Sequence, residues 1–487
     1  MALVVLFAIG QQVRLGLNTD VSWLMIVADR LLGGATLYRD IFEVNPPASV
    51  WLYLPQVALA NALGIRAEAV VAGSVFVTAG LSMGLAAGIA KPDRRDAARL
   101  MPVVAAVLLV MPGAAFAQRE QFAVIFLLPW LALCLARAER RPVRAWLAVA
   151  AGVGAGVAVA IKPPFAAAAG LPLLWTAWTM RAWRPLVAPE SLAAALVVIA
   201  YGASVWLWQP LYLIEALPLL RDGYLAVRSP ILALVADPYV VTTLVIAAAA
   251  MMRARKQGDT SAVIVLLLAA AGFGIALLVQ GKGFLNHQLP IAMLAVIACA
   301  WPLLRARGTG PILLLAAAGW LAFLATQVTG YPALTALVRQ VGPGEPRLMV
   351  AATNLSIGHP LTRQVSGRWV GTRGSLWATG TASELIDQAT DPARKARLQQ
   401  IIDEDRALFV ADIQRGKPDL VIADAPGLRW IARYPEVAAA LADYCFAGRA
   451  EGMTLLSREA ARSPRGASAP PGRACSARTA GSGSAGR

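Results

Sequence analysis

Long runs of apolar residues recur along this chain and constrain its fold more than any other feature. A helix needs about 20 such residues to cross roughly 30 Å of hydrocarbon. Because no water is available there, a crossing segment satisfies its backbone polar groups as a helix. We predict eleven spans, near residues 1–17, 69–90, 100–117, 121–136, 146–161, 165–180, 190–208, 234–252, 261–280, 288–304 and 309–328. Residues 1–328 are therefore predicted to form an all-α polytopic membrane domain.

Basic residues predict the orientation of these helices. The net charge is +16, but Lys and Arg are dispersed in short loops, which is typical of membrane orientation and not of nucleic-acid binding. The loops richest in them are predicted to be cytoplasmic: 91–99, 137–144, 181–184, 253–256 and 305–307. If the run 48–63 also crossed, the loop 91–99 would be exported. We therefore predict that 48–63 is a re-entrant or surface-lying helix. No small-residue cleavage site follows the first span, so we expect it to be retained.

The composition changes after the last predicted span. Residues 330–460 mix polar and apolar residues without a further span, and a small extracytoplasmic α/β domain is expected there. Within it, 418–424 is predicted as a buried strand, 425–427 as a turn and 429–443 as a helix. The tail 462–487 is rich in Ser, Gly, Ala and Arg and is predicted to be disordered. Two cysteines in this part of the chain could pair: Cys445 and Cys475.

Acidic residues gather in the predicted first outer loop, residues 18–68. Only 15% of the chain is charged, yet one short stretch contains Asp20, Asp29, Asp40 and Glu43. An acid at the centre of a membrane helix costs about 2.5–3.5 kcal/mol on insertion scales, so acids in or near a bilayer are commonly functional. The cluster therefore predicts a reaction site at the outer edge of the membrane.

Polar side chains also occur at the outer ends of three other segments. Arg119 and Glu120 form a very short outer turn, Lys162 precedes two prolines, and Lys282 and His287 belong to a glycine-containing polar stretch. A solvated turn would account for Arg119 and Glu120, and a side chain extended toward water would account for Lys162. The alternative is that these cations bind phosphate, which a guanidinium recognises through two parallel hydrogen bonds. Cations and carboxylates at one leaflet favour transfer from a lipid-linked phosphate.

The first outer loop resembles that of the GT-C glycosyltransferases, which include protein O-mannosyltransferases and the aminoarabinose transferases of lipid A. One helix is followed by an acid, and the later segment LYRDIFEVNPP, residues 37–47, precedes a surface helix. In that group the first acid of the loop is the catalytic base, which corresponds to Asp20. The acid before the Pro-Pro pair corresponds to Asp40 or Glu43. The resemblance implies a multi-pass glycosyltransferase of the bacterial inner membrane that uses a polyprenyl-phosphate sugar.

The implied chemistry gives each candidate residue a role. Asp20 would take the proton of the acceptor, while Arg119, Lys162 and Lys282 would bind the donor phosphate. Four side chains would orient the sugar or the acceptor: Asp40, Glu43, Glu120 and His287. Val21 replaces the second acid of the O-mannosyltransferase pair, and the sequence has no Asp-x-Asp motif. We expect an inverting reaction with no metal and no cofactor. The acceptor could be a glycan, a lipid or a protein.

Two other classes of protein share some of these features. A secondary transporter or flippase also has many spans, but it usually carries polar residues near the membrane midplane. Here the polar groups lie at one end of the predicted spans, which disfavours transport. A non-catalytic envelope assembly subunit is the second alternative, and its outer domain would bind a partner.

Overall fold

The computed structural model describes residues 1–304, 319, 321 and 330–458, which form two compact units. Unit 1 comprises Met1–Val21, Asn45–Ile214 and Val227–Val328. Unit 2 comprises Ser22–Val44, Glu215–Ala226 and Thr329–Arg487. Most of the predicted span 309–328, the tail 462–487 and Cys475 lie outside the described residues.

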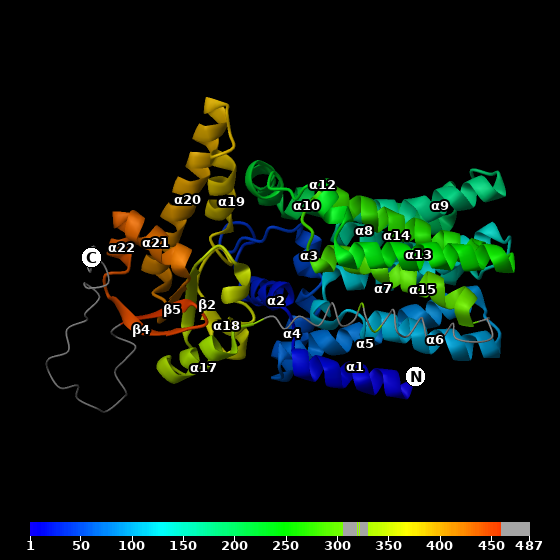
Figure 1. Cartoon of the computed structure of the whole chain (residues 1–487), viewed down its shortest axis with the longest axis horizontal. Coiled ribbons are helices and arrows are strands. Elements are labelled where there is room, and N and C mark those ends of the chain that lie inside the picture. Colours follow the sequence, from blue (N-terminus) through cyan, green and yellow to red (C-terminus); the bar gives the residue numbers. More distant parts are fainter. Residues whose placement is uncertain (305–318, 320, 322–329, 459–487) are drawn as a thin grey trace, which may run out of the picture. The chain divides into compact units, whose positions relative to one another are not determined.

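Unit 1 consists of helices that follow the apolar runs, most of them side by side (Figure 1). The longer helices are α1 (Ala2–Leu15), α5 (Ala67–Ala90), α6 (Arg94–Leu109), α7 (Arg119–Ala138), α8 (Ala145–Ile161), α9 (Ala166–Met180), α10 (Pro189–Trp208), α13 (Pro238–Gln257), α14 (Ser261–Gln280) and α15 (Leu285–Leu304). The short ones are α3 (Pro47–Trp51), α4 (Leu54–Leu63), η1 (Gly113–Ala115), η2 (Pro163–Phe165), η3 (Arg184–Val187) and α12 (Ile231–Val235). Ten of the predicted spans thus fall on observed helices.

Several of these helices have the length and apolar character of membrane spans. Among the described residues, α5, α7, α10, α14 and α15 meet both requirements. The pair α1 and α2 (Thr19–Leu32), bent by 79°, would add a sixth if it formed one broken span. The structure is thus that of a polytopic membrane protein, while the count of eleven spans stays a prediction.

Small residues allow the closest helix packing in unit 1. A Cβ atom on Gly152 of α8 would lie 2.0 Å from the carbonyl oxygen of Glu190 on α10. One on Gly156 would lie 2.7 Å from the carbonyl oxygen of Ala194. Glycine one turn apart therefore lets the two backbones approach, as in many membrane helix pairs.

Within the predicted first outer loop, α3 and α4 fall on the run 48–63 that was predicted to be helical. Helix α2 lies where a loop was expected, which corrects that part of the prediction, and Asp20 is in its first turn. Asn18 explains this start, because its side-chain oxygen accepts a hydrogen bond from the backbone nitrogen of Val21 at 3.1 Å. The predicted span 100–117 is also shifted, since α6 begins at Arg94 after the capping residue Asp93 and ends at Leu109.

Unit 2 contains a five-stranded mixed sheet in the order β2-β1-β3-β5-β4. The strands are β1 (Arg347–Ala351), β2 (Arg368–Trp369), β3 (Leu420–Ala423), β4 (Tyr444–Ala450) and β5 (Met453–Arg458). β1 is parallel to β2 and β3, whereas β5 is antiparallel to β3 and β4. β3 is buried throughout and β1 is buried after its first residue, as expected for strands covered on both faces.

Besides most of α2, unit 2 contains further helices (Figure 1). They are η4 (Tyr212–Ala216), which starts within unit 1, α11 (Leu217–Leu219), η5 (Leu220–Tyr224), α17 (Pro332–Val341), η6 (Leu355–Ile357), α18 (Leu361–Gln364), α19 (Trp377–Ile386), α20 (Pro392–Gly416), α21 (Ala425–Arg433) and α22 (Pro435–Ala440). The predicted turn 425–427 is instead the first turn of α21, because Asp424 caps that helix through the backbone nitrogen of Gly427. The predicted helix 429–443 is interrupted at Tyr434, before Pro435.

Candidate active site

A salt bridge between α2 and α7 brings Asp20 and Arg119 together in unit 1. The Nη2 atom of Arg119 lies 3.5 Å from Oδ2 of Asp20. The two side chains differ in exposure, which is 4% for Arg119 and 37% for Asp20. The site therefore presents a solvent-accessible carboxylate backed by a buried guanidinium, as a base beside an anion-binding group requires.

A second group of charges lies next to this pair. Lys162 Nζ donates a hydrogen bond to Glu120 Oε1 at 2.8 Å and lies 3.2 Å from His287 Nε2. His287 Nε2 is 3.9 Å from the same Glu120 oxygen. All three residues are buried, and Glu120 is completely so. Five of the eight predicted site residues are thus gathered by the structure of unit 1.

Hydrogen bonds of the Asn18 and Gln121 side chains hold the turn that positions Arg119 and Glu120. Asn18 donates to the carbonyl oxygens of Ala114 and Phe116 at 3.0 and 3.3 Å, and this joins the start of α2 to the segment that leads into α7. Gln121 accepts from the backbone nitrogen of Ala117 at 2.6 Å. Ala117 has a φ of 63°, which is uncommon for a residue with a Cβ atom. These bonds fix the turn immediately before Arg119.

The segment that follows the acids also supports the cluster. Ser49 Oγ on α3 donates to the carbonyl oxygen of Ile161, the residue before Lys162, at 3.1 Å. Tyr53 donates its hydroxyl hydrogen to the carbonyl oxygen of Ala117 at 2.7 Å. Ser49, Tyr53 and Asn18 were not predicted as site residues. Their only sequence signal is that they are polar groups within or beside apolar runs.

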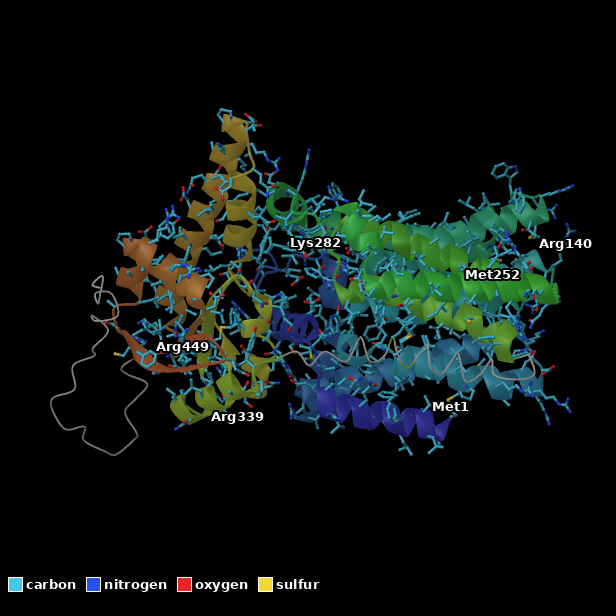
Figure 2. The ribbon with its side chains drawn as sticks, viewed as in Figure 1. Met1, Arg140, Met252, Lys282, Arg339 and Arg449 are labelled. Atoms are coloured by element: carbon cyan, nitrogen blue, oxygen red, sulfur yellow. The ribbon has the colours of Figure 1, made fainter. Side chains whose placement is uncertain are left out.

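Lys282 lies at one end of unit 1, and Arg140 lies at the other (Figure 2). Its Nζ atom donates a hydrogen bond to the carbonyl oxygen of Val227 at 2.6 Å, and the residue is half-buried. Lys282 contributes positive potential at His287. Its predicted role in phosphate binding stays a prediction.

Asp40 and Glu43 belong to unit 2, where both side chains bind protein groups. The backbone nitrogen of Thr36 donates to Asp40 Oδ2 at 2.7 Å, and this bond lowers the pKa of Asp40. Glu43 is 1% exposed, and its Oε2 atom accepts a hydrogen bond from Trp23 Nε1 at 2.5 Å. These contacts hold the 36–43 segment together, and the predicted orienting roles of both acids stay untested.

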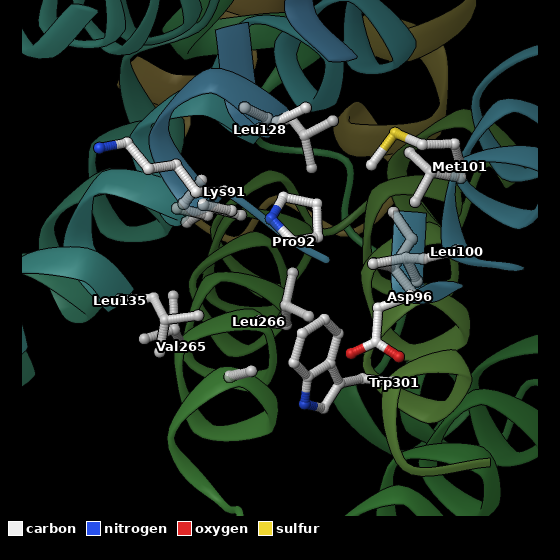
Figure 3. Close-up of a pocket in the computed structure, with 18 of the residues that line it drawn as sticks. Lys91, Pro92, Asp96, Leu100, Met101, Leu128, Leu135, Val265, Leu266 and Trp301 are labelled. Atoms are coloured by element: carbon white, nitrogen blue, oxygen red, sulfur yellow. The ribbon is translucent and has the colours of Figure 1, made fainter. Parts of the chain in front are cut away.

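A cavity of about 500 Å³ is lined in part by the second half of α7 (Figure 3). Apolar side chains such as Leu128, Leu135 and Leu266 line it, with Asp96 and Trp301 among the polar lining groups. Leu128, the lining residue of α7 nearest to Glu120, is eight residues further along the helix, about 12 Å at 1.5 Å per residue. The cavity is therefore separate from the candidate active site. Within the part of the chain that the structure describes, no group of three or more His, Cys, Asp or Glu side chains could hold a metal ion.

The fold of this chain is the GT-C fold, which confirms the resemblance drawn from the first outer loop. A solved structure that shows it is that of ArnT from Cupriavidus metallidurans, crystallised with undecaprenyl phosphate. The similarity covers 95% of this chain and 99% of that one, with a TM-score of 0.61 and 12% sequence identity. No protein-family model matches the sequence, and no curated protein matches it either.

Proposed function

We propose that this protein is a membrane glycosyltransferase that moves a sugar from a polyprenyl-phosphate donor to a hydroxyl or amine acceptor. The observation that carries the proposal is the Asp20–Arg119 salt bridge, with Lys162 and Glu120 buried behind it. It combines a base that solvent can reach with fixed cations, the two requirements of this transfer. The GT-C fold and the undecaprenyl phosphate bound to ArnT support the same class of donor.

In the proposed reaction, an Asp20 oxygen takes the proton from the acceptor hydroxyl. The acceptor oxygen then forms a bond to the anomeric carbon, and the bond from that carbon to the phosphate oxygen breaks. The electron pair leaves with the polyprenyl phosphate. Displacement by one attacking oxygen inverts the anomeric configuration.

The salt bridge couples the two charge changes of this reaction. Before proton transfer, the Asp20 carboxylate balances the charge of Arg119. When Asp20 becomes protonated, that balance is removed while the phosphate gains negative charge. Arg119 can then stabilise the leaving phosphate, in a buried setting where electrostatic interactions are stronger than in water.

The proposal also places the protein in its environment. We propose that it lies in the bacterial inner membrane, with the Asp20 cluster and unit 2 on the extracytoplasmic side. The bias of basic residues toward the loops 91–99, 137–144, 181–184 and 253–256 supports this orientation. The acceptor would be a glycan, a lipid or a protein of the cell envelope.

Incorporation of label from radiolabelled polyprenyl-phosphate sugars, in membranes that contain the protein, tests this function. Asp20→Asn keeps the side-chain shape but removes the base, so transfer should fall by about 10²–10⁴-fold. Asp29→Asn, an exposed position on the same helix, is the matched control. If Asp20→Asn keeps full transfer while Asp40→Asn or Glu43→Gln abolishes it, the base lies in the 36–43 segment. Full transfer by all three variants would exclude a GT-C-type site.

A further inference from the structure

The Lys162 ammonium is fixed by groups from three other parts of unit 1. Glu120 of α7 accepts one hydrogen bond at 2.8 Å, and His287 of α15 lies on another side at 3.2 Å. The ring of Phe165 has its centroid 5.9 Å from Nζ. Because Lys162 follows the end of α8 directly, three helices and η2 meet at one ammonium group.

The contact with Lys162 determines how His287 is protonated. An ammonium group only donates hydrogen bonds, so Nε2 of His287 must accept this one. The ring is then neutral and carries its hydrogen on Nδ1. A doubly protonated ring would instead place two positive groups 3.2 Å apart within a buried site.

We propose that Glu120 and His287 are positioning residues that act through Lys162, holding its ammonium toward the phosphate of a lipid-linked donor. The inference rests on the proposed function, and it replaces the sugar-orienting role that the sequence predicted for both residues. Charge supports the change. The Glu120 carboxylate would repel a phosphate, and the neutral His287 ring presents Nε2 to Lys162, so Lys162 is the cation of the trio that can bind the anion.

Glu120 also keeps Lys162 charged. Burial lowers the pKa of Lys162, and the Glu120 carboxylate opposes that change more than any other group. The other charged groups that face the ammonium are Arg119 of α7, which lowers the pKa further, and Asp20 of α2, which raises it. His287 of α15 is neutral in this arrangement. Removal of the Glu120 charge should therefore let Lys162 lose its proton at a lower pH.

Binding of undecaprenyl phosphate to the full chain in detergent tests the role of each partner. His287→Gln keeps a hydrogen-bond acceptor and should bind within about threefold of the wild type, whereas His287→Leu removes the acceptor. A hydrogen bond to a charged group contributes about 1.5–3 kcal/mol, so His287→Leu should weaken binding by about 10–150-fold. Glu120→Gln should weaken it similarly, and its binding should fall away at a lower pH than that of the wild type.

Three results would contradict the inference. One is equal binding by His287→Gln and His287→Leu, because a role in packing alone would treat them alike. Another is wild-type affinity in both His287→Leu and Glu120→Gln. The third is an unchanged pH profile in Glu120→Gln. Thermal unfolding of each variant, measured on the same preparations, separates lost binding from lost folding.

Nitrogen NMR of the histidine rings tests the arrangement without any lipid. The chain has two histidines, so selective ¹⁵N labelling gives two rings, and His287→Gln assigns them. We expect Nε2 of His287 to be unprotonated and Nδ1 to carry the hydrogen. We expect Lys162→Met to remove the preference for this tautomer. A protonated Nε2 in the wild type would overturn the inference. A wild type that shows the expected tautomer but binds no undecaprenyl phosphate would overturn the proposed function and the phosphate target instead.

Discussion

Arg119 illustrates at the residue scale how a membrane protein can keep a buried cation. Its side chain is 4% exposed, and one of its carboxylate partners, Asp20, lies 3.5 Å away. A buried charge whose partner is removed is destabilising by several kcal/mol, so the cluster must be nearly neutral to be stable. Two cations and two carboxylates meet that condition in Arg119, Lys162, Asp20 and Glu120. An anionic donor that binds here would bring negative charge next to the two cations, Arg119 and Lys162.

Arg119→Ala should weaken donor binding and should also slow the chemical step, because Arg119 is proposed to stabilise the leaving phosphate. A charge-assisted contact to phosphate contributes about 1.5–3 kcal/mol, which corresponds to about 10–150-fold in affinity. Direct binding of undecaprenyl phosphate, together with kcat and KM for transfer, checks this. Arg140→Ala changes an exposed arginine at the other end of unit 1 and should leave binding unchanged. If the Arg119→Ala variant bound undecaprenyl phosphate as well as Arg140→Ala does, Arg119 would not contact the phosphate.

The sequence predicted which charged residues form the site, but not the residues that hold them in place. Asp20 and Arg119 stand out because charge is rare in an apolar chain, and the structure brings them together. Asn18, Ser49 and Tyr53 carry no charge, and their partners lie 64 to 112 positions away in the sequence. Such roles depend on tertiary contacts, which no local pattern encodes.

At the scale of elements, the contact between α8 and α10 depends on glycines. In lipid, helices gain little from burying apolar surface, so association depends on close van der Waals packing. Helix α10 is also joined to α7 by a salt bridge of 2.8 Å, between Glu190 at the start of α10 and Arg137 near the end of α7. The start of α10 is therefore held by both backbone packing and an ion pair.

Gly152→Ala should destabilise unit 1. The added Cβ atom would lie 2.0 Å from a backbone oxygen of α10, which cannot move aside as a flexible side chain could. Overpacking of this kind costs about 1–3 kcal/mol. The free energy of unfolding in detergent measures the effect. Gly202→Ala on α10, where nothing lies within 4 Å, is the matched control. Equal stability of the two variants would show that α8 and α10 are not in close contact.

Helix positions were predictable where apolar runs were long, and not where burial depends on another part of the chain. Helix α2 was predicted as loop because it carries acids. Its Trp23 is nevertheless buried, in ring contacts with His359 and Trp369 at 4.9 and 6.1 Å. The rings that bury Trp23 are therefore more than 300 positions away in the sequence.

At the scale of the whole molecule, the two compact units do not follow the change in composition. Residues 22–44 and 215–226 belong to unit 2 although apolar helices flank them. Arg30 donates to the carbonyl oxygens of Gly371 and Asp40, each at 3.0 Å, and Arg397 donates to Asp222 at 3.1 Å. The composition of a segment predicts whether lipid or water surrounds it. The tertiary contacts of that segment decide to which of the two units it belongs.

Unit 2 should lose stability below pH 6.5 because His359 is buried. Burial lowers the pKa of His359 to about 3, from 6.5 when exposed. Between those values the unfolded state binds the proton and the folded state does not. Stability therefore falls by about 1.4 kcal/mol per pH unit as the pH drops from 6.5 toward 3.

Hydrogen exchange of the β1 and β3 amides in the full-length protein measures this dependence. His359→Phe keeps a ring between Trp23 and Trp369 but cannot be protonated, so its exchange should change less over the same pH range. The same pH response in both proteins would assign the effect to other groups, such as the carboxylates of unit 2.

The Asp20–Arg119 salt bridge also makes a prediction about topology. The two residues lie 3.5 Å apart, so an even number of membrane crossings must separate them along the chain. If α5 and α6 both cross, as the sequence predicts, they supply two crossings, which leaves none for the segment between Asn45 and Arg66. Its helix α4 has 10 residues and spans about 15 Å, half of the hydrocarbon thickness. We therefore expect a cysteine at position 66 to face the same side as Asp20, and one at position 95 to face the opposite side.

Labelling of cells with a membrane-impermeant maleimide checks this arrangement. Arg66→Cys should react in intact cells, and Arg95→Cys only after permeabilisation. The native Cys134 and Cys299 are buried in helices and should contribute little background, and Cys445 and Cys475 are replaced by serine in the labelled protein. If Arg66→Cys also required permeabilisation while Arg95→Cys reacted in intact cells, residues 45–66 would cross the membrane. Three crossings would then place Asp20 and Arg119 on opposite faces, and a base and its phosphate-binding cation could not form one active site.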